Sequence, residues 1–357
     1  MKSFDSVTGF ILPDPKNRLF LWSVFLVVSL ISGAYFVGNA FFAKEYKQRL
    51  ARWGLIHTMP DSKFNSCKRQ CLPFGSEALP EGIIARTSNL EMRPLWDSGK
   101  DNGILKRPLN LLAMAVGLEQ KEIVNKIVEK FLSSDFVVML FHYDGFVDGW
   151  KSLAWSSRAI HRFLHPDIVV EYNYIFLWDE DLLVDNFDPK RYLSIVKEEG
   201  LEISQPALDP TKSEVHHPLT VHKAGSKVHR RYYKLKGSGR CDDKSTAPPC
   251  IGWVEMMAPV FSKKSWQCVW HLIQNDLIHA WGLDRQLGYC AQGDRMQNVG
   301  VVDSEYIAPS GSSGDNRAKV RMQSYIEMQV FGKRWKDAAE KDKCWIDPYE
   351  KANKTGH

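Results

Sequence analysis

Three consecutive acids, Asp179, Glu180 and Asp181, form the most chemically informative group of this chain. They directly follow Tyr174-Ile175-Phe176-Leu177-Trp178, a short apolar run that predicts a buried strand. Open α/β sheets bind their ligands at the carboxyl ends of strands, where these acids would lie. Carboxylates this close together repel one another, and a divalent cation with oxygen ligands would relieve the repulsion. The alternative is an acidic turn whose carboxylates cap the next helix.

The spacing of the acids indicates which of them would bind a cation. In an extended chain Asp179 and Asp181 point to one side and Glu180 to the other. An Asp-x-Asp pair after a hydrophobic strand is the arrangement by which nucleotide-sugar transferases hold a divalent metal on a diphosphate. We therefore predict that Asp179 and Asp181 hold Mn²⁺ or Mg²⁺, with Asp181 as the direct ligand and Asp179 also contacting the nucleotide sugar. The metal would neutralise charge that builds on the leaving diphosphate.

Further acids are candidates for contacts with the substrates. Asp284 lies in Trp281-Gly282-Leu283-Asp284-Arg285, and Glu255 lies in an earlier apolar segment. Either carboxylate could orient or deprotonate an acceptor hydroxyl, so we assign both as catalytic candidates. The alternative for Asp284 is a cap of the turn after Gly282, which would itself end a helix. Asp144, at the end of an early predicted strand, is a candidate contact to the nucleoside.

A basic segment rich in histidine follows the acids. Arg230 and Arg231 are candidates to clamp a diphosphate, and a solvated basic face is the alternative. The segment has no helical spacing and no cysteine that would support a metal site. We therefore favour solvated or stacked imidazoles over metal ligands for its histidines, which are His216, His217, His222 and His229.

Apolar patterning predicts an α/β domain. Strands alternate with amphipathic helices, which is typical of a doubly wound, mainly parallel sheet. The predicted strands cover Leu109–Val116, Phe136–Phe141, Tyr172–Trp178, Leu201–Leu208, Trp253–Phe261 and Val299–Ile307. The predicted helices cover Gln120–Leu132, Ser152–Leu164, Asp188–Gly200, Lys264–Ala280 and residues 317–347.

The N-terminal part of the chain predicts a membrane anchor. From Leu19 to Phe42 the sequence carries no charge, which is long enough for one transmembrane helix. A cleaved signal peptide is the alternative, and Lys and Arg flank both ends of the segment. The predicted organisation is a tail at 1–18, a signal anchor at 19–42, a stem at 43–106, the α/β domain at 107–310 and a helical tail at 311–357.

Cysteine content and composition narrow the class of protein. Cys241 and Cys250 bracket a polar loop that a disulfide would close, whereas we expect Cys268 and Cys290 to be free buried thiols. A disulfide and the glycosylation sequon at Asn353 both favour a lumenal compartment. The net charge of +5 is mild and charges of both signs are interleaved, so no nucleic-acid partner is expected. The chain lacks the glycine-rich dinucleotide and P-loop motifs and the G-x-S-x-G motif of hydrolases.

Several long motifs of the chain resemble one family. The sequence is similar to a plant family known as domain of unknown function 707, whose members are often labelled lysine-ketoglutarate-reductase trans-splicing related. The resemblance implies a fold like that of GT-A glycosyltransferases. It also implies a single-pass, type II Golgi membrane protein with a lumenal catalytic domain, a nucleotide-sugar donor and a glycan acceptor. The motifs that carry it lie at 163–182, 254–261, 275–284 and 301–307.

The chain departs from the resemblance at one position. The family generally carries a histidine after the block that ends at Ile307, and in GT-A folds such a histidine often completes the metal site. Here Ala308-Pro309-Ser310 follows, and no histidine appears before His357. Two hypotheses therefore stand side by side: a metal-dependent glycosyltransferase, and an inactive binding or scaffold protein on the same fold. A reductase or regulator is a third, and the oligomeric state is left open.

Overall fold

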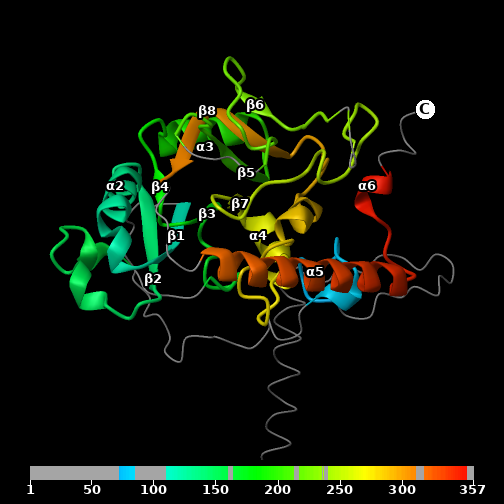
Figure 1. Cartoon of the computed structure of the whole chain (residues 1–357), viewed down its shortest axis with the longest axis horizontal. Helices are drawn as coiled ribbons and strands as arrows, with labels where there is room; N and C mark the ends of the chain where they lie inside the picture. The colour runs from blue at the N-terminus through cyan, green and yellow to red at the C-terminus, as the bar shows by residue number, and fades with distance from the viewer. Residues whose placement is uncertain are drawn as a thin grey trace, which may run out of the picture. The chain divides into compact units, whose positions relative to one another are not determined.

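The computed structural model describes residues 72–84, 110–159, 164–212, 217–234, 236, 240–310 and 317–351 (Figure 1). The chain separates into two compact units, residues 1–66 and 67–357, and all described residues belong to the second. The predicted tail at 1–18, the predicted anchor at 19–42 and the sequon at Asn353 lie outside the described residues. Among those that are described, no helix is long and apolar enough to cross a bilayer.

The second unit alternates strands with helices, as the sequence predicts. The strands are β1 (Asn110–Val116), β2 (Phe136–His142), β3 (Tyr174–Trp178), β4 (Leu182–Leu183), β5 (Ile203–Leu208), β6 (Val228–His229), β7 (Val260–Ser262) and β8 (Val299–Pro309). The α-helices are α2 (Lys121–Leu132), α3 (Pro189–Glu198), α4 (Lys263–Val269), α5 (Arg317–Lys341) and α6 (Pro348–Lys351). Short 3₁₀ helices are η1 (Glu81–Ile83), η3 (Leu118–Gln120), η4 (Val147–Trp150), η5 (Ser156–Arg158), η6 (Trp270–Leu272) and η7 (Asp284–Cys290).

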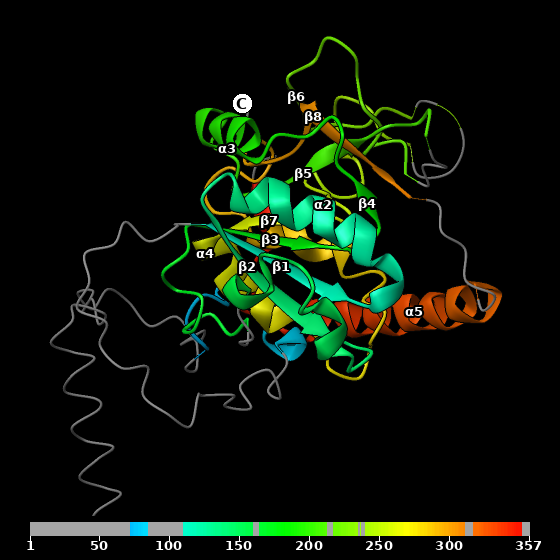
Figure 2. The same ribbon diagram turned by 90° about the vertical axis from the view of Figure 1, so that its left-hand side faces the viewer.

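The strands form one eight-stranded mixed sheet in the order β2-β1-β3-β7-β5-β8-β4, with β6 also paired to β8. Strands β1, β2 and β3 are mutually parallel, and so are β5 and β8. Strand β7 runs antiparallel to both β3 and β5, so these two groups of strands point the same way. The predicted mainly parallel sheet is confirmed, and the carboxyl ends of β1, β2 and β3 meet at one edge (Figure 2).

Helices cover both faces of this sheet. Helices α2 and α3 lie on one face and α4 and α5 on the other (Figures 1 and 2). Strand β3 serves both layers, because Phe176 and Trp178 pack with α2 and α3 whereas Ile175 packs with α4 and α5. Alternation along the strand therefore buries both of its faces, which explains why its sequence is continuously apolar. Because both faces of β3 are buried, the strand ends where the charged residues begin.

Helix α3 begins as its sequence predicts. Asp188 is the N-cap, and its carboxylate accepts a hydrogen bond from Arg191 N at 2.8 Å. Pro189 occupies the first turn, where the missing N–H has no intrahelical partner to lose. A second acid adds to this cap, since Glu305 of β8 accepts a hydrogen bond from Asp188 N at 2.6 Å. The helix is thereby fixed to the sheet at its N-terminus.

Three predicted elements differ from the structure. The segment predicted as a helix from Ser152 contains only η5, and residues 160–163 lie outside the described residues. The helix predicted to run to Ala280 ends at Val269 and gives way to η6, after which Gln274-Asn275-Asp276 supplies the polar residues of a turn. The strand predicted over Trp253–Phe261 is reduced to β7. Its earlier residues form a loop beside β3, and that loop carries the candidate acid Glu255.

Two predicted boundaries also need correction. Residues 72–84, which the sequence assigned to the stem, pack into the domain, because Leu79 and Ile83 are buried with α4 and α5. Residues 317–341, assigned to a C-terminal tail, form α5, whose Phe331 and Trp335 belong to the same core. Both segments therefore complete the second face of the sheet.

The cysteines form more bonds than the sequence indicated. The predicted disulfide between Cys241 and Cys250 is present. The expectation of free thiols at Cys268 and Cys290 is wrong, because they form a disulfide that ties α4 to η7. Their separation of 22 residues gave no local signal of pairing. The second disulfide closes the segment between α4 and the loop that carries Asp284.

Candidate functional site

The three acids lie where β3 ends and the chain bends. Asp179 N donates to the carbonyl of Met257 at 2.9 Å, and Ser310 N donates to the carbonyl of Asp181 at 2.7 Å. The first bond continues the alignment of β3 with the segment before β7, and the second joins the acids to the end of β8. The backbone of the acidic turn is therefore fixed on both sides, which leaves the side chains to determine its chemistry.

Glu180 is engaged with the protein. Its carboxylate accepts hydrogen bonds from Gly117 N at 2.6 Å and from the Tyr143 hydroxyl at 2.5 Å. These donors follow β1 and β2, so Glu180 connects the ends of three adjacent strands. A Cβ at position 117 would lie 2.4 Å from the Tyr143 hydroxyl, so a larger residue there would displace Tyr143 from its contact with Glu180. The prediction that Glu180 plays a supporting role agrees with this geometry.

The carboxylates of Asp179 and Asp181 have no hydrogen-bond donor among the described residues. Asp179 is exposed, yet the surrounding protein desolvates it. Desolvation, followed by repulsion from Asp181 and Glu180, raises the pKa of Asp179 to about 7. A nearby cation would favour the charged form and reverse this shift. Two accessible carboxylates without donors thus fit the oxygen ligands of a hard divalent cation.

The strand pairing places residues 308–310 beside the acidic turn. Leu182 pairs with Pro309 and Leu183 pairs with Ala308, so residues 308–310 lie next to Asp181. This is the segment in which the resemblance leads us to expect a histidine. Throughout the described ranges, no cluster of three or more His, Cys, Asp or Glu side chains is placed to hold a metal ion. Among the described residues, the carboxylates of Asp179 and Asp181 would be the protein ligands of a cation, and water or a diphosphate would complete its coordination.

Glu255 and Asp284, the two candidates to orient or deprotonate an acceptor hydroxyl, lie near each other. The charge of Asp284 contributes to raising the pKa of Glu255, and burial is the larger cause of that rise, to about 7. Burial also raises the pKa of Asp284, although its Oδ1 accepts a hydrogen bond from Arg285 N at 2.9 Å. The indole N–H of Trp253 lies close to Asp284 without forming a hydrogen bond of normal geometry. The structure thus brings together two acids that burial drives toward their protonated forms.

Glu255 is only 7% exposed, and the protein leaves part of it unsatisfied. Its Oε2 is buried with no hydrogen-bond partner of normal geometry, although the Thr220 side chain lies close enough to lower the pKa of Glu255, and its Oε1 lies 3.6 Å from His217 Nε2. The backbone is held in place because Glu255 N donates to Gln205 Oε1 at 2.6 Å. His217 in turn packs edge-on against Trp253, with 4.5 Å between ring centroids. An orphaned carboxylate oxygen in a fixed position suits a group that receives a proton from a substrate.

Asp144, Arg230 and Arg231 each bind other groups of the protein. Asp144 accepts hydrogen bonds from Leu118 N at 2.8 Å and Phe146 N at 3.0 Å, and these bonds lower its pKa. It closes the loops after β1 and β2 on the same edge as the acids. The guanidinium of Arg230 binds Glu199 at 2.9 Å, and that of Arg231 binds the carbonyls of the loop closed by Cys241 and Cys250. Neither arginine contacts the acids, so their role as a diphosphate clamp stays a prediction that the geometry does not support.

The histidines behave largely as stacked or buried rings, and sequence reasoning missed one buried pair. His222 stacks on Tyr306, with 4.3 Å between ring centroids. His229 contacts Asp303 through Nδ1 at 2.7 Å and the carbonyl of Leu219 through Nε2 at 2.5 Å. A carbonyl only accepts hydrogen bonds, so Nε2 is the donor in its contact with Leu219. Asp303, which has no local signal apart from an acid in an apolar strand, therefore holds the loop before β6 to β8.

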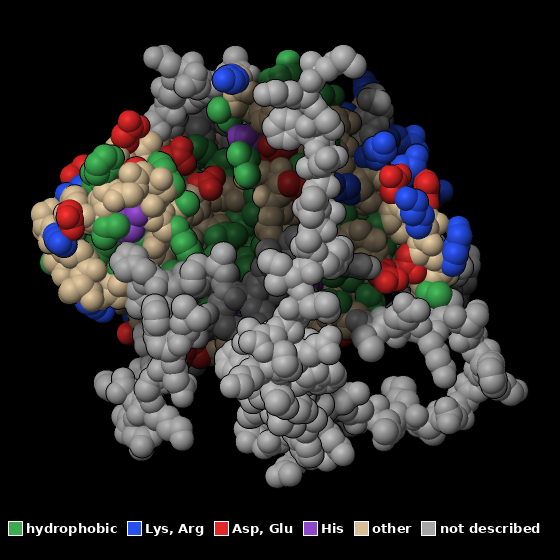
Figure 3. Space-filling view, turned by 90° about the horizontal axis from the view of Figure 1, so that it is seen from below, with side chains coloured by type: hydrophobic (Ala, Val, Ile, Leu, Met, Phe, Trp, Pro, Cys, Tyr) green, Lys and Arg blue, Asp and Glu red, His purple; other side chains and the backbone are tan. Residues whose placement is uncertain are grey.

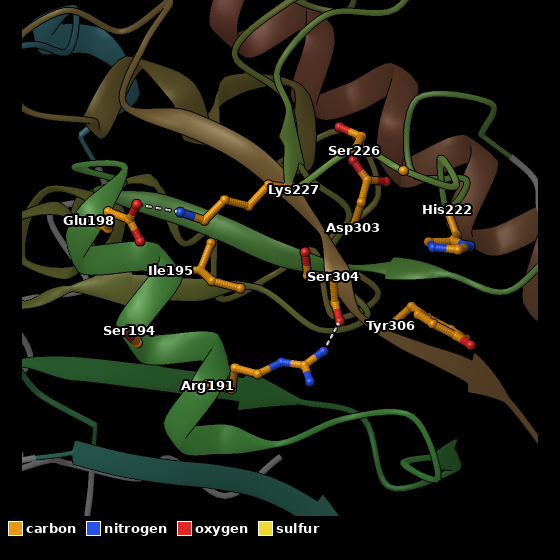
Figure 4. Close-up of a pocket in the computed structure, with 11 residues that line it drawn as sticks. Arg191, Ser194, Ile195, Glu198, His222, Ser226, Lys227, Asp303, Ser304 and Tyr306 are labelled. Atoms are coloured by element: carbon orange, nitrogen blue, oxygen red, sulfur yellow. Dashed lines mark hydrogen bonds and ion pairs between the residues drawn. The ribbon is translucent and has the colours of Figure 1, made fainter.

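A separate shallow pocket lies along the outer side of α3 (Figure 4). Its volume is about 710 Å³. The charged groups at its rim are already paired, because Lys227 Nζ binds Glu198 at 2.6 Å and an Arg191 guanidinium nitrogen donates to the Ser304 carbonyl at 2.8 Å. None of the candidate acids lines it. We therefore place the candidate site at the strand edge rather than in this pocket.

Comparison with known sequences identifies the family. A family model described as "Protein of unknown function (DUF707)" matches residues 70–341. The chain belongs to the DUF707 family. The match begins close to the first described residues and ends with the last residue of α5, which agrees with the placement of both segments in one folded unit. No curated protein matches the chain significantly.

Among solved structures, two of S. aureus TarS share limited similarity with this DUF707 chain. The structure of TarS residues 1–349 has 7% identity and a TM-score of 0.35, and the alignment covers 63% of this chain and 64% of that one. A second TarS structure has 9% identity and a TM-score of 0.35, with 63% and 42% covered. The chain thus spans less than two thirds of either TarS chain. At this level the similarity assigns neither an activity nor a site.

Proposed function

We propose that the protein is a metal-dependent glycosyltransferase that moves a sugar from a nucleotide sugar to a glycan acceptor. This proposal rests on one observation: the three acids at the end of β3 differ in their hydrogen-bond partners. Protein donors hold Glu180, whereas Asp179 and Asp181 present exposed or half-buried carboxylates that no described donor satisfies. Coulombic repulsion in this turn is relieved by Mn²⁺ or Mg²⁺, and a bound cation attracts the diphosphate of a nucleotide sugar.

Each residue has a role in this reaction. A metal held by Asp179 and Asp181 supplies Lewis-acid stabilisation of the leaving diphosphate. Asp179 and Asp181 fix the donor at the sheet edge, and Glu180 keeps the turn in place through Gly117 and Tyr143. We assign Glu255 as the group that accepts the proton lost by the acceptor hydroxyl as its oxygen bonds to the sugar, which requires the acceptor to reach a side chain that is only 7% exposed in this structure. With a pKa of about 7, Glu255 can both take and release a proton near neutral pH.

We also propose a lumenal location in the Golgi membrane, with the type II orientation. The disulfides Cys241–Cys250 and Cys268–Cys290 support an oxidising compartment, because such bonds are rare in the cytosol. The uncharged segment at 19–42 supports a single span. Selective permeabilisation of cells that express a C-terminally tagged chain tests the orientation: a lumenal C-terminus becomes accessible to antibody only after the inner membranes are opened.

The activity is tested with the purified full-length chain, Mn²⁺ and a panel of UDP- and GDP-sugars, with release of nucleoside diphosphate as the signal. Asp179→Asn and Asp181→Asn are expected to lower turnover and Mn²⁺-dependent nucleotide binding by at least about 100-fold, since each removes a charged ligand. Glu180→Gln is the matched control, because it keeps the size of the side chain, its carbonyl oxygen can accept from Gly117 N, and its amide N–H can donate to the Tyr143 hydroxyl. An activity that survives either Asp→Asn change would remove the metal from the mechanism.

A catalytically inactive binding or scaffold protein is the second candidate. The specific observation in its favour is the segment 308–310, which lies beside Asp181 and carries no side chain that binds metals strongly. Calorimetry with UDP-sugars and Mn²⁺ separates the candidates, because binding without turnover indicates a scaffold. Ser310→His then tests the cause: if the missing ligand abolished catalysis, this substitution should strengthen Mn²⁺ binding and restore measurable turnover.

A further inference from the structure

Glu255 is buried, so the proton that it accepts needs a path from the acceptor. The side chain of His217 is 41% exposed, and its Nε2 lies 3.6 Å from Glu255 Oε1. This separation is within the range of an ion pair and slightly longer than a normal hydrogen bond. Contacts of catalytic groups are often this long before substrate binds and shorten when it does. His217 is therefore a side chain through which a dissolved molecule can exchange a proton with Glu255.

The structure holds both members of this pair in place. The carbonyl of His217 accepts hydrogen bonds from Thr220 N at 3.0 Å and from Thr220 Oγ1 at 2.9 Å, which fixes the turn that carries the imidazole. The imidazole itself packs edge-on against Trp253, with 4.5 Å between ring centroids. On the other side of the pair, Glu255 N donates to the fully buried Gln205 at 2.6 Å. The closeness of His217 to Glu255 is therefore a property of two anchored segments.

The segment that carries Glu255 continues past the end of β3. Leu177 N donates to the carbonyl of Pro259 at 3.0 Å, and Asp179 N donates to that of Met257 at 2.9 Å. Strand β7, which follows this segment, is antiparallel to β3. Residues before Met257 therefore run beyond the acidic turn, in the direction in which β3 points. This alignment brings Glu255 to the same edge of the sheet as the acids, where donor and acceptor would meet.

We propose that His217 relays the proton of the acceptor hydroxyl to Glu255, an inference that rests on the function proposed above. As the acceptor oxygen bonds to the sugar carbon, the bond from that carbon to the diphosphate breaks, and the diphosphate leaves with the electron pair. The acceptor O–H bond breaks and its proton goes to the imidazole of His217, which gives up its Nε2 proton to Glu255 Oε1. The relay replaces direct contact between the acceptor and Glu255. After the product leaves, the reverse path returns the proton to water.

The two groups have similar affinities for a proton, which a relay requires. Burial raises the pKa of Glu255 to about 7, the Thr220 side chain opposes the rise, and the charge of Asp284 adds to it. Arg285 lies next to Asp284 and offsets part of that charge. An ordinary imidazole has a pKa of about 6.5, so a proton passes between the two groups at little cost. Figure 3 shows exposed acidic and basic side chains at one surface of the domain, where water screens their charges, whereas Glu255 is shielded from water.

His217→Gln in the full-length chain tests the relay, because glutamine is polar but does not exchange a proton near neutral pH. In the assay with Mn²⁺ and nucleotide sugars, kcat should fall at least about 100-fold, and imidazole added to the buffer should restore at least about tenfold of that loss. The KM for the nucleotide sugar should stay within about threefold, because the change affects the chemical step and not donor binding. His165→Gln is the matched control, since His165 also packs edge-on against a tryptophan, Trp270, and lies 3.8 Å from the carboxylate of Asp167. It should show neither the loss nor the rescue.

A second readout needs no turnover. Nuclear magnetic resonance of the labelled imidazoles follows the titration of His217, whose signal is the one that His217→Gln removes. His217 should titrate at a lower pH in Glu255→Gln than in the wild type, because the amide carries no charge that stabilises the imidazolium. A wild type without turnover but with this difference refutes the proposed function alone. The relay is overturned if His217 titrates identically in both proteins, or if His217→Gln keeps the activity of an active wild type.

Discussion

Substitution of Glu255 by glutamine should change how the stability of the protein depends on pH. Burial raises the pKa of Glu255 from its ordinary value of 4.5 to about 7, and the charge of Asp284 adds to the rise. The folded protein therefore keeps this proton up to about pH 7, whereas the unfolded chain releases it near pH 4.5. Between these values the folded state binds more protons, so stability falls as the pH rises. The amide introduced by Glu255→Gln does not titrate, and the variant should lack this loss.

The expected size follows from the same values. One tenfold change in proton affinity corresponds to about 1.36 kcal/mol, so a pKa rise from 4.5 to about 7 is equivalent to about 3 kcal/mol. Because Glu255 is only 7% exposed, solvent screens this cost little. The free energy of unfolding of Glu255→Gln minus that of the wild type should thus increase by about 2–3 kcal/mol between about pH 4.5 and about pH 8. The amide adds a constant offset at all pH values, since it leaves a buried polar group unpaired.

Urea denaturation followed by tryptophan fluorescence at a series of pH values measures this difference. Subtraction of the wild type removes the contribution of Asp179, whose pKa is also raised to about 7 and which destabilises the protein in the same direction. His217, 3.6 Å from Glu255, is left intact in both proteins. Glu122→Gln, at an exposed position of α2, is the control for the chemical change from Glu to Gln. If Glu255→Gln gives the same dependence on pH as Glu122→Gln, Glu255 does not have the raised pKa on which this prediction rests.

Two further predictions concern stability. Replacement of both Cys268 and Cys290 by Ala opens a loop of 22 residues and should lower the free energy of unfolding by about 3 kcal/mol, measured in urea without reductant. Asp303→Asn removes the carboxylate that contacts His229 and should lower the free energy of unfolding by about 3–5 kcal/mol, because both groups are buried. An unchanged urea midpoint in the Asp303→Asn variant would contradict a structural role for this pair.

The residues within each element were enough to predict the strand and the helix around the acids. Strand β3 is apolar on both faces because α2 and α3 cover one face and α4 and α5 the other, so a short run of five residues marked it unambiguously. The start of α3 was equally local, since Asp188 and Pro189 carry the signal for an N-terminus in their own side chains. In both cases the sequence signal lies within a few residues of the element that it predicts.

Long-range contacts account for what the sequence did not reveal. Glu180 is held by Gly117 and Tyr143, which are 63 and 37 residues away, so alternation along the strand gave its direction but not its partners. Helix α4 stops early although the apolar spacing continues, because the following turn packs against residues 72–84, where His271 Nε2 contacts the carbonyl of Phe74 at 3.3 Å. The disulfide from Cys268 and the burial of Glu255 likewise depend on segments that meet only in the folded chain.

The segment 308–310 distinguishes an active glycosyltransferase from an inactive binding protein more directly than the acids do. β4 pairs Leu182 with Pro309, and Ser310 N donates to the carbonyl of Asp181, so the backbone of this segment runs beside Asp181. Two carboxylates leave most positions of a six-coordinate Mn²⁺ or Mg²⁺ to water and phosphate oxygens, which such ions tolerate. Metal affinity would then depend strongly on the bound nucleotide, because the diphosphate supplies ligands that the protein does not. A cation that binds together with a nucleotide sugar, but weakly without it, is therefore the behaviour that this geometry predicts for an active enzyme.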